Sequence, residues 1–522
     1  MGTIPAPFLS PDQQTASGGR RLNARPLRRL TLALWALLLF AACYLLHTRH
    51  NHFPYFYHPD EPGKVEQLLS RDWNYNHPML LLSTTRLTLD MAGVGSSEQA
   101  VVEAGRRVSA AFAAGAVVLL ALLAWQWRGW RASIVAGGAL ALHHQVYELS
   151  HYLKEDTALL FGLAAVFLFV FLFEQRPTLL RAAGLGAACA LAISGKYIGI
   201  IALLAALPVL WCAGNTRRAK GFAVFSLSLL AALAVVNLPL LWDLDEFRRS
   251  LADETGLVVK GQGGMTRRVP HTQYWNVFID NTTPVMWLLL PVFWVARWRE
   301  RRSLTLAEWI VIAFPFVYAV ALSFSPKSND RYFLPATAIF TLQAALGAID
   351  AGRWLVPRLG ARIAPAAAAV ALILGQVPSW LRYESAFQHD DTQELIAWLK
   401  RDVPVSAVIA KDNRVRLPDP QKKKDAARLG AVPQQVLASK FAADLGSLEE
   451  LRAKGITHVA VSESDYGRFF LKNLRPQNAG DPDFARRKLF YERLLREGDL
   501  VFKRDRGTVI YLHPGIHVYR IQ

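Results

Sequence analysis

Residues 30–46 read LTLALWALLLFAACYLL, an apolar run without a charged residue, and they follow the basic residues Arg28 and Arg29. A run of this length and composition is typical of a helix that crosses a membrane. Because the run continues without a small-residue cleavage site, we expect a signal anchor rather than a cleaved signal peptide. The polar residues 1–29 are then predicted to form a disordered cytoplasmic tail.

Further apolar runs recur along the chain of 522 residues, which is 52% hydrophobic and only 19% charged. The mean hydropathy is +0.19. This composition is typical of polytopic membrane proteins. About eleven spans are predicted, near residues 30–47, 105–125, 132–149, 157–174, 182–194, 197–213, 221–241, 284–297, 307–323, 332–349 and 363–378.

The net charge of +18 is explained by the membrane topology and not by nucleic-acid binding. Arginine and lysine cluster in short loops, and a cytoplasmic N-terminus places every such loop on the cytoplasmic side. These loops are 127–131, 175–181, 214–220, 297–302 and 351–362. The segments predicted outside are 48–104, 150–156, the turn at Gly195-Lys196, 242–283, 324–331 and the region beyond about 385.

The C-terminal region has a different pattern from the apolar bundle. Short β-like runs alternate there with helical patterns, which predicts a small extracytoplasmic α/β domain over residues 385–522. The β-like runs are Val405–Ala410, Thr457–Val461 and Thr508–Leu512. The predicted fold class is therefore a mainly α, polytopic helical membrane protein with a transmembrane domain over 30–384 and this C-terminal domain.

Asp60 and Glu61 are the first candidates for chemistry, in the stretch His58-Pro59-Asp60-Glu61-Pro62. Such a pair is often a solvated part of a loop. Here the prolines restrict the backbone, and the loop is rich in aromatic residues. A carboxylate held in this way can act as a general base. His58 and His77 either position a substrate or bind backbone groups.

Lys154-Glu155-Asp156 opens the fourth predicted span at its outer end. Acidic residues at a helix N-terminus can be simple caps. They can also orient an acceptor or help to hold a cation. Both alternatives stay open from the sequence.

Three cations lie on the outer side, where the positive-inside rule does not ask for them. Lys196 lies in the turn Ser194-Gly195-Lys196-Tyr197, while Lys327 and Arg331 precede a late span. Contact with lipid phosphate, or an ion pair with Asp330, would be a structural explanation. The functional alternative is a ligand phosphate, which arginine can bind through two parallel hydrogen bonds.

Together these motifs resemble the GT-C class of integral-membrane glycosyltransferases. The resemblance is closest to bacterial members related to protein O-mannosyltransferases and lipid A aminoarabinose transferases, and it covers roughly residues 30–380. It is carried by Asp60-Glu61, Asn76-His77-Pro78, Lys154-Glu155-Asp156, Gly195-Lys196-Tyr197, and Arg331-Tyr332 with Leu334-Pro335.

The resemblance implies an inverting transfer of a sugar from a polyprenyl-phosphate donor to an envelope lipid, glycan or protein. It implies that Asp60 is the catalytic base, with Glu61 and Asp156 as further acidic catalytic positions. Donor phosphate would be bound by Lys196 and Arg331, with Lys327 nearby. Substrate would be positioned by His58, His77, Lys154, Glu155 and Tyr332.

Two questions remain open at this stage. The enzyme either uses no cofactor or holds a divalent cation, Mg²⁺ or Mn²⁺, on Glu155 and Asp156.

The expected location is the inner membrane of a bacterium, in contact with membrane lipids and without nucleic acid. A secondary transporter or lipid-carrier flippase and a non-catalytic envelope assembly protein are the rival functions. A transporter would place its ionisable groups near the middle of the membrane.

Overall fold

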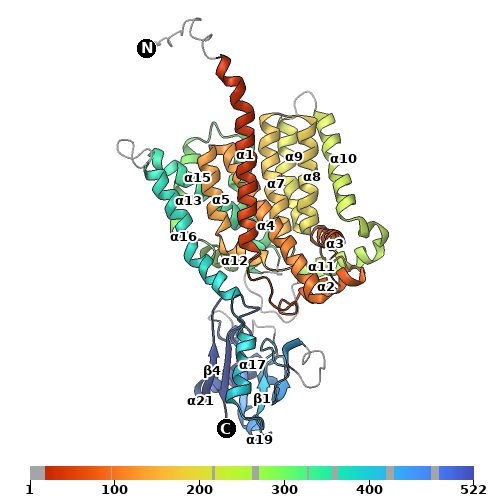
Figure 1. Ribbon diagram of the computed structural model, residues 1–522, viewed down its shortest axis with the longest axis vertical. Helices are drawn as coiled ribbons and strands as arrows, with labels where there is room; N and C mark the ends of the chain where they lie inside the picture. The colour runs from red at the N-terminus through yellow and green to blue at the C-terminus, as the bar shows by residue number, and fades with distance from the viewer. Residues whose placement is uncertain are drawn as a thin grey trace.

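The computed structural model describes residues 18–93, 95, 97–213, 218–260, 270–325, 329–354, 363–418, 428–471 and 481–522. Lys327 lies outside the described residues. The described chain forms a bundle of long helices, with a small domain built on a β-sheet at one end of it (Figure 1). The chain is thus a polytopic helical membrane protein with a small C-terminal α/β domain, as the sequence predicts.

The long helices of the bundle run along its vertical axis in Figure 1. They are α1 (Gly18–His47), α4 (Glu98–Arg128), α5 (Trp130–Ala141), α7 (Asp156–Gln175), α8 (Leu179–Gly195), α9 (Ala202–Ala213), α10 (Arg218–Val236), α13 (Pro284–Arg299), α14 (Leu306–Ser323), α15 (Leu334–Trp354) and α16 (Ile363–Phe387).

In the described residues, seven helices are long and apolar enough to cross a membrane, or eight if the bent pair α12 (Pro270–Asp280) and α13 counts as one span. Two of the remaining predicted spans, 182–194 and 197–213, correspond to shorter apolar helices, which contain α8 and α9. A third predicted span, 132–149, begins with α5. α5 has 12 residues, which extend about 18 Å against a hydrocarbon core of about 30 Å. After α5, a break leads into α6 (His144–Ser150). The number of eleven spans therefore stays a prediction.

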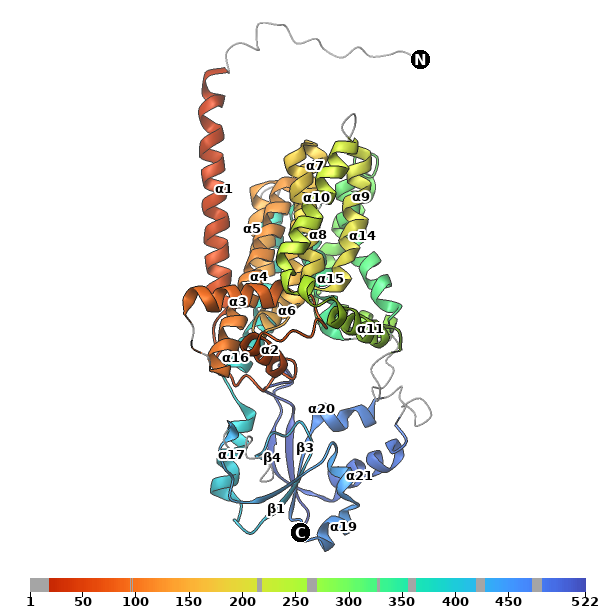
Figure 2. The same ribbon diagram turned by 90° about the vertical axis from the view of Figure 1, so that its right-hand side faces the viewer.

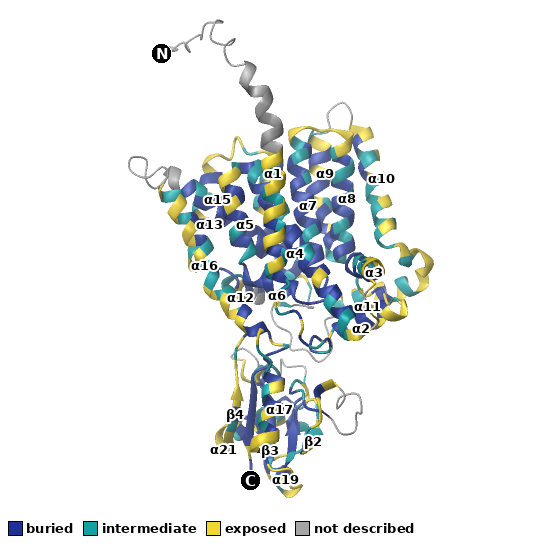
Figure 3. Ribbon diagram, in the orientation of Figure 1, coloured by how far each residue is buried: buried dark blue, intermediate teal, exposed yellow. Residues whose placement is uncertain are grey.

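Burial separates the inner helices of the bundle from the outer ones (Figure 3). In α7, 83% of the most apolar window is buried, whereas the value is 11% in both α10 and α16. The exposed residues of the outer helices include large apolar side chains such as Leu230 and Leu374. A helix that is apolar on its exposed face is suited to lipid and not to water.

One end of the bundle collects the basic ends of the helices. Arg128, at the end of α4, donates to Glu300 at 2.9 Å, and Arg297 of α13 donates to Asp350 of α15 at 2.7 Å. Glu174 of α7 accepts from backbone N–H groups at the start of α14. α7 begins at the other end of the bundle, which is the end next to the small domain (Figure 1).

Short helices cover the end of the bundle that faces the small domain (Figure 2). The predicted outer loops 48–104 and 242–283 supply them as α2 (Glu61–Ser70), α3 (Leu80–Ala92), α11 (Leu244–Lys260) and α12. These segments are thus folded over the ends of the long helices.

The small domain contains a five-stranded sheet in the order β2-β1-β3-β5-β4. β1 (Val408–Lys411) is parallel to β2 (Gln435–Ala438) and β3 (His458–Ser462), while β5 (Ile516–Arg520) is antiparallel to β3 and β4 (Asp499–Arg504). The helices of the domain include α17 (Asp391–Asp402), α19 (Leu448–Ala453), α20 (Glu463–Tyr466) and α21 (Phe484–Glu497).

The predicted strand at residues 508–512 is wrong. This stretch is a turn in the connection from β4 to β5. Gly507 and Val509 have φ values of 62° and 52°, and a left-handed backbone at two nearby residues does not continue a strand. The apolar residues there are used for packing, since Val509 and Leu512 are both buried.

The small domain contacts the first outer loop and the end of α16. Arg416 donates to the carbonyl of Tyr57, and the Tyr57 hydroxyl donates to Asp390 at 2.6 Å. His513 lies 2.6 Å from the carbonyl of Ala386 through its Nε2 atom. The predicted boundary between residues 384 and 385 falls inside α16, and the domain limits themselves stay predictions.

Candidate active site

Asp60 lies at the N-terminal boundary of α2, at the end of the loop that connects α1 to α2. Pro62 lies in the first turn of α2, where its missing N–H costs no hydrogen bond. The Asp60 side chain is 37% exposed. Its Oδ2 atom accepts a hydrogen bond from Lys154 and lies 3.6 Å from Nη2 of Arg331. Within the described residues no group donates to Oδ1, so this oxygen remains available to a substrate.

Asp156 is the first residue of α7, and it is buried. Its Oδ1 atom accepts a hydrogen bond from Lys196 at 2.7 Å, and its Oδ2 atom lies 3.7 Å from Nε of Arg331. Arg331, in a single helical turn just before α15, thus contacts both Asp60 and Asp156. Residues from four separate segments of the chain therefore meet at one place.

Lys196 lies at the end of α8, and its ammonium group is 4.3 Å from the ring centroid of Tyr332. A cation at this distance from an aromatic face is attracted by the ring. Tyr332 therefore helps to hold Lys196 beside Asp156. This contact agrees with the sequence prediction that Tyr332 belongs to the site, while its role toward a substrate stays a prediction.

Glu155 forms an ion pair with Lys64 of α2, and both side chains are buried. Burial would raise the pKa of Glu155, but the Lys64 ammonium group and His77 hold it well below its usual value. Burial lowers the pKa of Lys64 to about 8, in spite of the opposing effect of Glu155. The pair is therefore charged at neutral pH, and Lys64 loses its proton near pH 8.

The side chain of Glu61 has different partners from the side chain of Asp60, although the two residues are adjacent. The two carboxylate oxygens of Glu61 accept from Nε and Nη2 of Arg106 at 2.9 and 2.6 Å, and the N–H of Leu153 donates to it as well, at 2.9 Å. Both side chains of the pair are fully buried. This bidentate pair ties α2 to α4, and it leaves Glu61 without an exposed oxygen.

The two predicted histidines differ in exposure. The His58 ring is buried between Tyr152 and Tyr511, with ring centroids 4.8 and 4.2 Å away, and its Nδ1 accepts from the N–H of Asp60 at 3.2 Å. His58 therefore shapes the backbone that carries Asp60. His77 is partly exposed, and desolvation together with the nearby lysines lowers its pKa to about 4, against the opposing effect of Glu155. It is neutral at neutral pH.

Exposure divides the charged groups of this site, which we call the bundle-end cluster: Asp60, Lys64, Lys154, Glu155, Asp156, Lys196 and Arg331. Among these described residues, four cations face three carboxylates, so the cluster has one positive charge in excess. Asp60 is 37% exposed, Arg331 18% and Lys196 14%, while Lys154 and Asp156 are each 2% exposed. The groups within reach of a ligand are therefore one carboxylate and two cations.

The electrostatics keep Asp60 ionised. Burial raises its pKa, but Lys154, His58 and Arg331 together lower it well below the usual value. A carboxylate with a lowered pKa is a weak base until its cationic neighbours are occupied by another anion. Of the groups that lower the pKa of Asp60, Arg331 is the cation that an anionic ligand can reach.

The excess positive charge of the bundle-end cluster disfavours a divalent cation there. Each of the three carboxylates already faces an ammonium or guanidinium group, and the cluster as a whole is positive. Oε2 of Glu155 and Oδ2 of Asp156 are buried without a hydrogen-bond partner among the described residues, but a Mg²⁺ or Mn²⁺ ion held there would lie against the positive charges of Lys64, Lys196 and Arg331. In the described part of the chain, the group suited to a metal lies elsewhere, in the C-terminal domain.

The structure brings together most of the residues predicted from the sequence, and it adds others. Lys327 lies outside the described residues, and Glu61 faces Arg106 instead of the open side. The sequence analysis missed Lys64 and Arg106. Lys64 lies three residues after Glu61 on α2, a spacing that places side chains on one face of a helix. Arg106 lies beside Arg107 near the start of a span, where a buried charge needs a partner.

Comparisons with known proteins give a likeness in structure only. No family model and no curated protein match the sequence. The structure is similar to that of ArnT from Cupriavidus metallidurans bound to undecaprenyl phosphate, with a TM-score of 0.49 and 13% identity over 94% of this chain and 98% of that chain. It is similar to the Archaeoglobus fulgidus oligosaccharyltransferase in complex with Zn and sulfate, with a TM-score of 0.48 and 11% identity over 92% and 73%.

A third similar structure is the Saccharomyces cerevisiae protein O-mannosyltransferase Pmt1-Pmt2 complex bound to its sugar donor. Its TM-score is 0.34, with 19% identity over 42% of this chain and 34% of that chain. Because every TM-score is below 0.5, we draw no conclusion about this chain from these structures, and the function proposed below rests on the geometry of the bundle-end cluster.

Proposed function

We propose that the protein is an inverting glycosyltransferase that uses a polyprenyl-phosphate-linked sugar. One observation carries this proposal: a partly exposed carboxylate, Asp60, lies 3.6 Å from a partly exposed cation, Arg331, which in turn shares Asp156 with Lys196. A displacement at a sugar carbon needs these two functions side by side. The carboxylate takes a proton from the acceptor, and the cations stabilise the departing phosphate.

In the proposed reaction, the acceptor hydroxyl or amine gives its proton to Oδ1 of Asp60. The acceptor atom forms a bond to the anomeric carbon while the bond from that carbon to the phosphate oxygen breaks. The electron pair of the broken bond leaves with the polyprenyl phosphate, whose negative charge is stabilised by Arg331 and Lys196. Attack opposite the leaving group inverts the anomeric centre.

Donor binding prepares the base in this scheme. A bound phosphate offsets the positive charge of Arg331, which acts together with Lys154 and His58 to lower the pKa of Asp60 in the free protein. The pKa of Asp60 then rises, and the carboxylate becomes a better proton acceptor when the donor is in place. The buried groups Lys154 and Asp156 act as positioning residues for Asp60, Lys196 and Arg331.

Glu61, His58 and His77 have other proposed roles. Glu61 positions α2 against α4 through Arg106 and does not touch a substrate. His58 positions the backbone of Asp60. His77 is neutral and partly exposed beside the cluster, which suits contact with an uncharged part of a substrate. The chemistry proposed for the cluster uses no metal ion.

The membrane context supports a lipid-linked donor and not transport. Asp156 opens α7, Lys196 follows α8 and Arg331 precedes α15, so the cluster lies at helix ends. A transporter would place such groups near the middle of the membrane. The basic helix ends lie at the opposite end of the bundle, which is cytoplasmic under the positive-inside rule. We infer that the C-terminal domain faces the outside of a bacterial inner membrane.

The proposal is tested by glycan and lipid analysis of cells. Cells that lack the protein are complemented with the wild type, with Asp60→Asn or with the control Asp72→Asn, an exposed carboxylate in the same outer loop. Mass spectrometry is expected to show a glycosylated envelope component that is lost in the deletion, restored by the wild type and the control, and absent with Asp60→Asn at equal membrane levels. A restored product with Asp60→Asn would overturn the proposal.

A further inference from the structure

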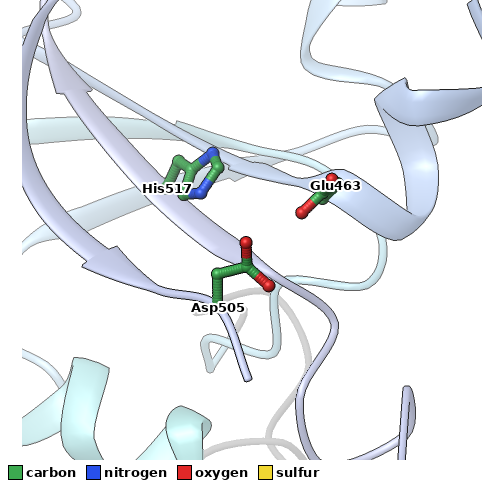
Figure 4. A group of neighbouring side chains, drawn as sticks. All are labelled: Glu463, Asp505 and His517. Atoms are coloured by element: carbon green, nitrogen blue, oxygen red, sulfur yellow. The ribbon is translucent and has the colours of Figure 1, made fainter. Parts of the chain in front are cut away.

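A second group of ionisable side chains lies far from the bundle-end cluster, on the C-terminal domain. Glu463 is the first residue of α20, Asp505 follows β4, and His517 lies in β5. One potential ligand atom from each residue lies within 4.8 Å of the other two. Figure 4 shows the three side chains converging on one space from these three segments. We call them the domain triad.

His517 supplies an observation that is independent of the two carboxylates. The residue is 7% exposed, and its Nε2 atom is buried without a hydrogen-bond partner. Its other ring nitrogen, Nδ1, lies 3.0 Å from the Tyr466 hydroxyl. A buried nitrogen without a partner costs free energy unless something binds it.

Among the described residues, no lysine or arginine contacts the two carboxylates of the domain triad, although Lys503 is close enough to act on Glu463 electrostatically. Neither Glu463 nor Asp505 forms an ion pair with a lysine or arginine there. The arginines on either side of Asp505 turn to α17: Arg504 pairs with Glu394, and Arg506 pairs with Asp391 and Glu394. The triad is therefore an acidic site with an open nitrogen beside it.

We propose that Glu463, Asp505 and His517 bind one divalent transition-metal ion of the Zn²⁺ class. Two carboxylates and one imidazole are a ligand set that such ions accept, and imidazole favours them over Mg²⁺ and Ca²⁺. Bonds of about 2.0–2.1 Å place tetrahedral ligand atoms about 3.3 Å apart. Both carboxylates are exposed, so small side-chain rotations bring the ligand atoms to this separation, and water completes the coordination.

Tyr466 contacts the ring nitrogen of His517 that does not bind the ion in this proposal. A metal-bound imidazole usually donates its other N–H to a nearby acceptor, which fixes the tautomer and the ring orientation. The Tyr466 hydroxyl lies 3.0 Å from Nδ1 and is placed to accept from it, which leaves the lone pair of Nε2 free to bind the ion. Tyr466 is thus a positioning residue for the ion.

The ion would tie together segments that reach the bundle-end cluster. Asp505 begins the connection from β4 to β5, and Glu463 follows β3, whose partner in the sheet is β5. The same connection carries Tyr511, whose ring lies 4.2 Å from that of His58, two residues before Asp60. A bound ion would therefore hold the first residue of the connection from β4 to β5, and this connection packs against the loop that carries Asp60. This inference does not depend on the proposed transfer reaction.

The test measures Zn²⁺ binding to the purified full-length protein after treatment with a chelator. Competition with a chromophoric chelator is expected to show one more tightly bound Zn²⁺ in the wild type than in the double variant Glu463→Gln/Asp505→Asn. Each single substitution should weaken binding at least tenfold. Tyr466→Phe should weaken it about tenfold without changing the stoichiometry. The control Asp499→Asn, an exposed carboxylate of β4, should bind as the wild type does.

Because both carboxylates are exposed, the double variant is expected to fold, and its thermal unfolding in the absence of Zn²⁺ checks this. Equal Zn²⁺ affinity and stoichiometry in the wild type and the folded double variant would overturn the site. Hydrogen exchange gives a second readout, because Zn²⁺ should slow exchange in residues 505–515 of the wild type and not of the double variant. Exchange that Zn²⁺ leaves unchanged in the wild type would overturn the proposed tie between segments.

Discussion

The bundle-end cluster and the domain triad use the same acidic residue types and differ in what surrounds them. In the bundle-end cluster every carboxylate faces a lysine or arginine, and a positive charge is in excess. In the domain triad the carboxylates face a neutral nitrogen without a partner. The first arrangement is suited to an anion and the second to a cation. The partners of an acidic group, and not its presence, decide which kind of ligand a site can take.

The comparison predicts its largest effect at Asp60, because that carboxylate is the exposed one in the bundle-end cluster. Asp60→Asn removes the base and keeps the shape of the side chain. The rate of sugar transfer by the purified protein is expected to fall by about 10²–10⁴, while undecaprenyl phosphate still binds. A variant that transfers sugar at the wild-type rate would show that Asp60 is not the base.

Glu61 should respond in stability and not in chemistry. Glu61→Gln leaves the buried Arg106 without its charged partner, which typically costs about 3–5 kcal/mol. The melting temperature in detergent should fall clearly, whereas the control Glu66→Gln, on the exposed side of the same helix, should leave it unchanged. Equal melting temperatures for both variants would mean that the pair contributes little to the fold.

A substitution of Arg331 tests whether the bundle-end cluster binds an anion. Arg331→Gln removes a partly exposed cation, and charge-assisted hydrogen bonds contribute about 1.5–3 kcal/mol. The Kd for undecaprenyl phosphate should rise by about tenfold to a hundredfold, measured by titration of the protein in nanodiscs. The exposed Arg248 of α11 provides the control Arg248→Gln. If the two variants bind alike, Arg331 does not contact the phosphate.

The smallest expected effect concerns Lys64, whose titration should make the KM for the donor depend on pH. Its pKa of about 8 in the folded protein lies below the usual 10.5, chiefly because of burial. As the pH rises through about 8, Lys64 becomes neutral and the cluster loses its excess positive charge. The KM for the donor should therefore increase severalfold between pH 7 and pH 9.

Lys64→Arg provides the matched comparison, because arginine stays protonated over this range. The rise of KM should be absent in this variant. The same rise in both proteins would assign the pH dependence to another group.

The sequence predicted the helical bundle well, because long apolar runs and basic loops follow directly from the physics of the membrane. The helical patterns predicted in the C-terminal region, over residues 392–400, 447–454 and 485–496, also agree with α17, α19 and α21, because their periodicity is strong. It failed at residues 508–512, where apolar residues suggested a strand but the left-handed backbone at Gly507 and Val509 makes a turn. Short apolar runs do not distinguish a strand from a buried turn.

For the site, the sequence could name residues but not pair them. It selected Asp60, Asp156, Lys196 and Arg331, which the fold brings together. It could not separate Asp60 from Glu61, because only the packing of α2 against α4 shows which carboxylate is buried. The domain triad was missed altogether, since Glu463, Asp505 and His517 have no recognisable spacing and meet only through strand pairing.

The most direct measurement is a cryo-EM structure of the full-length protein with bound undecaprenyl phosphate. The proposed function predicts that the phosphate lies within about 3.2 Å of both Arg331 and Lys196, with Oδ1 of Asp60 facing open space beside it. A phosphate bound away from these cations, or separated from Asp60 by a layer of packed side chains, would contradict the central claim.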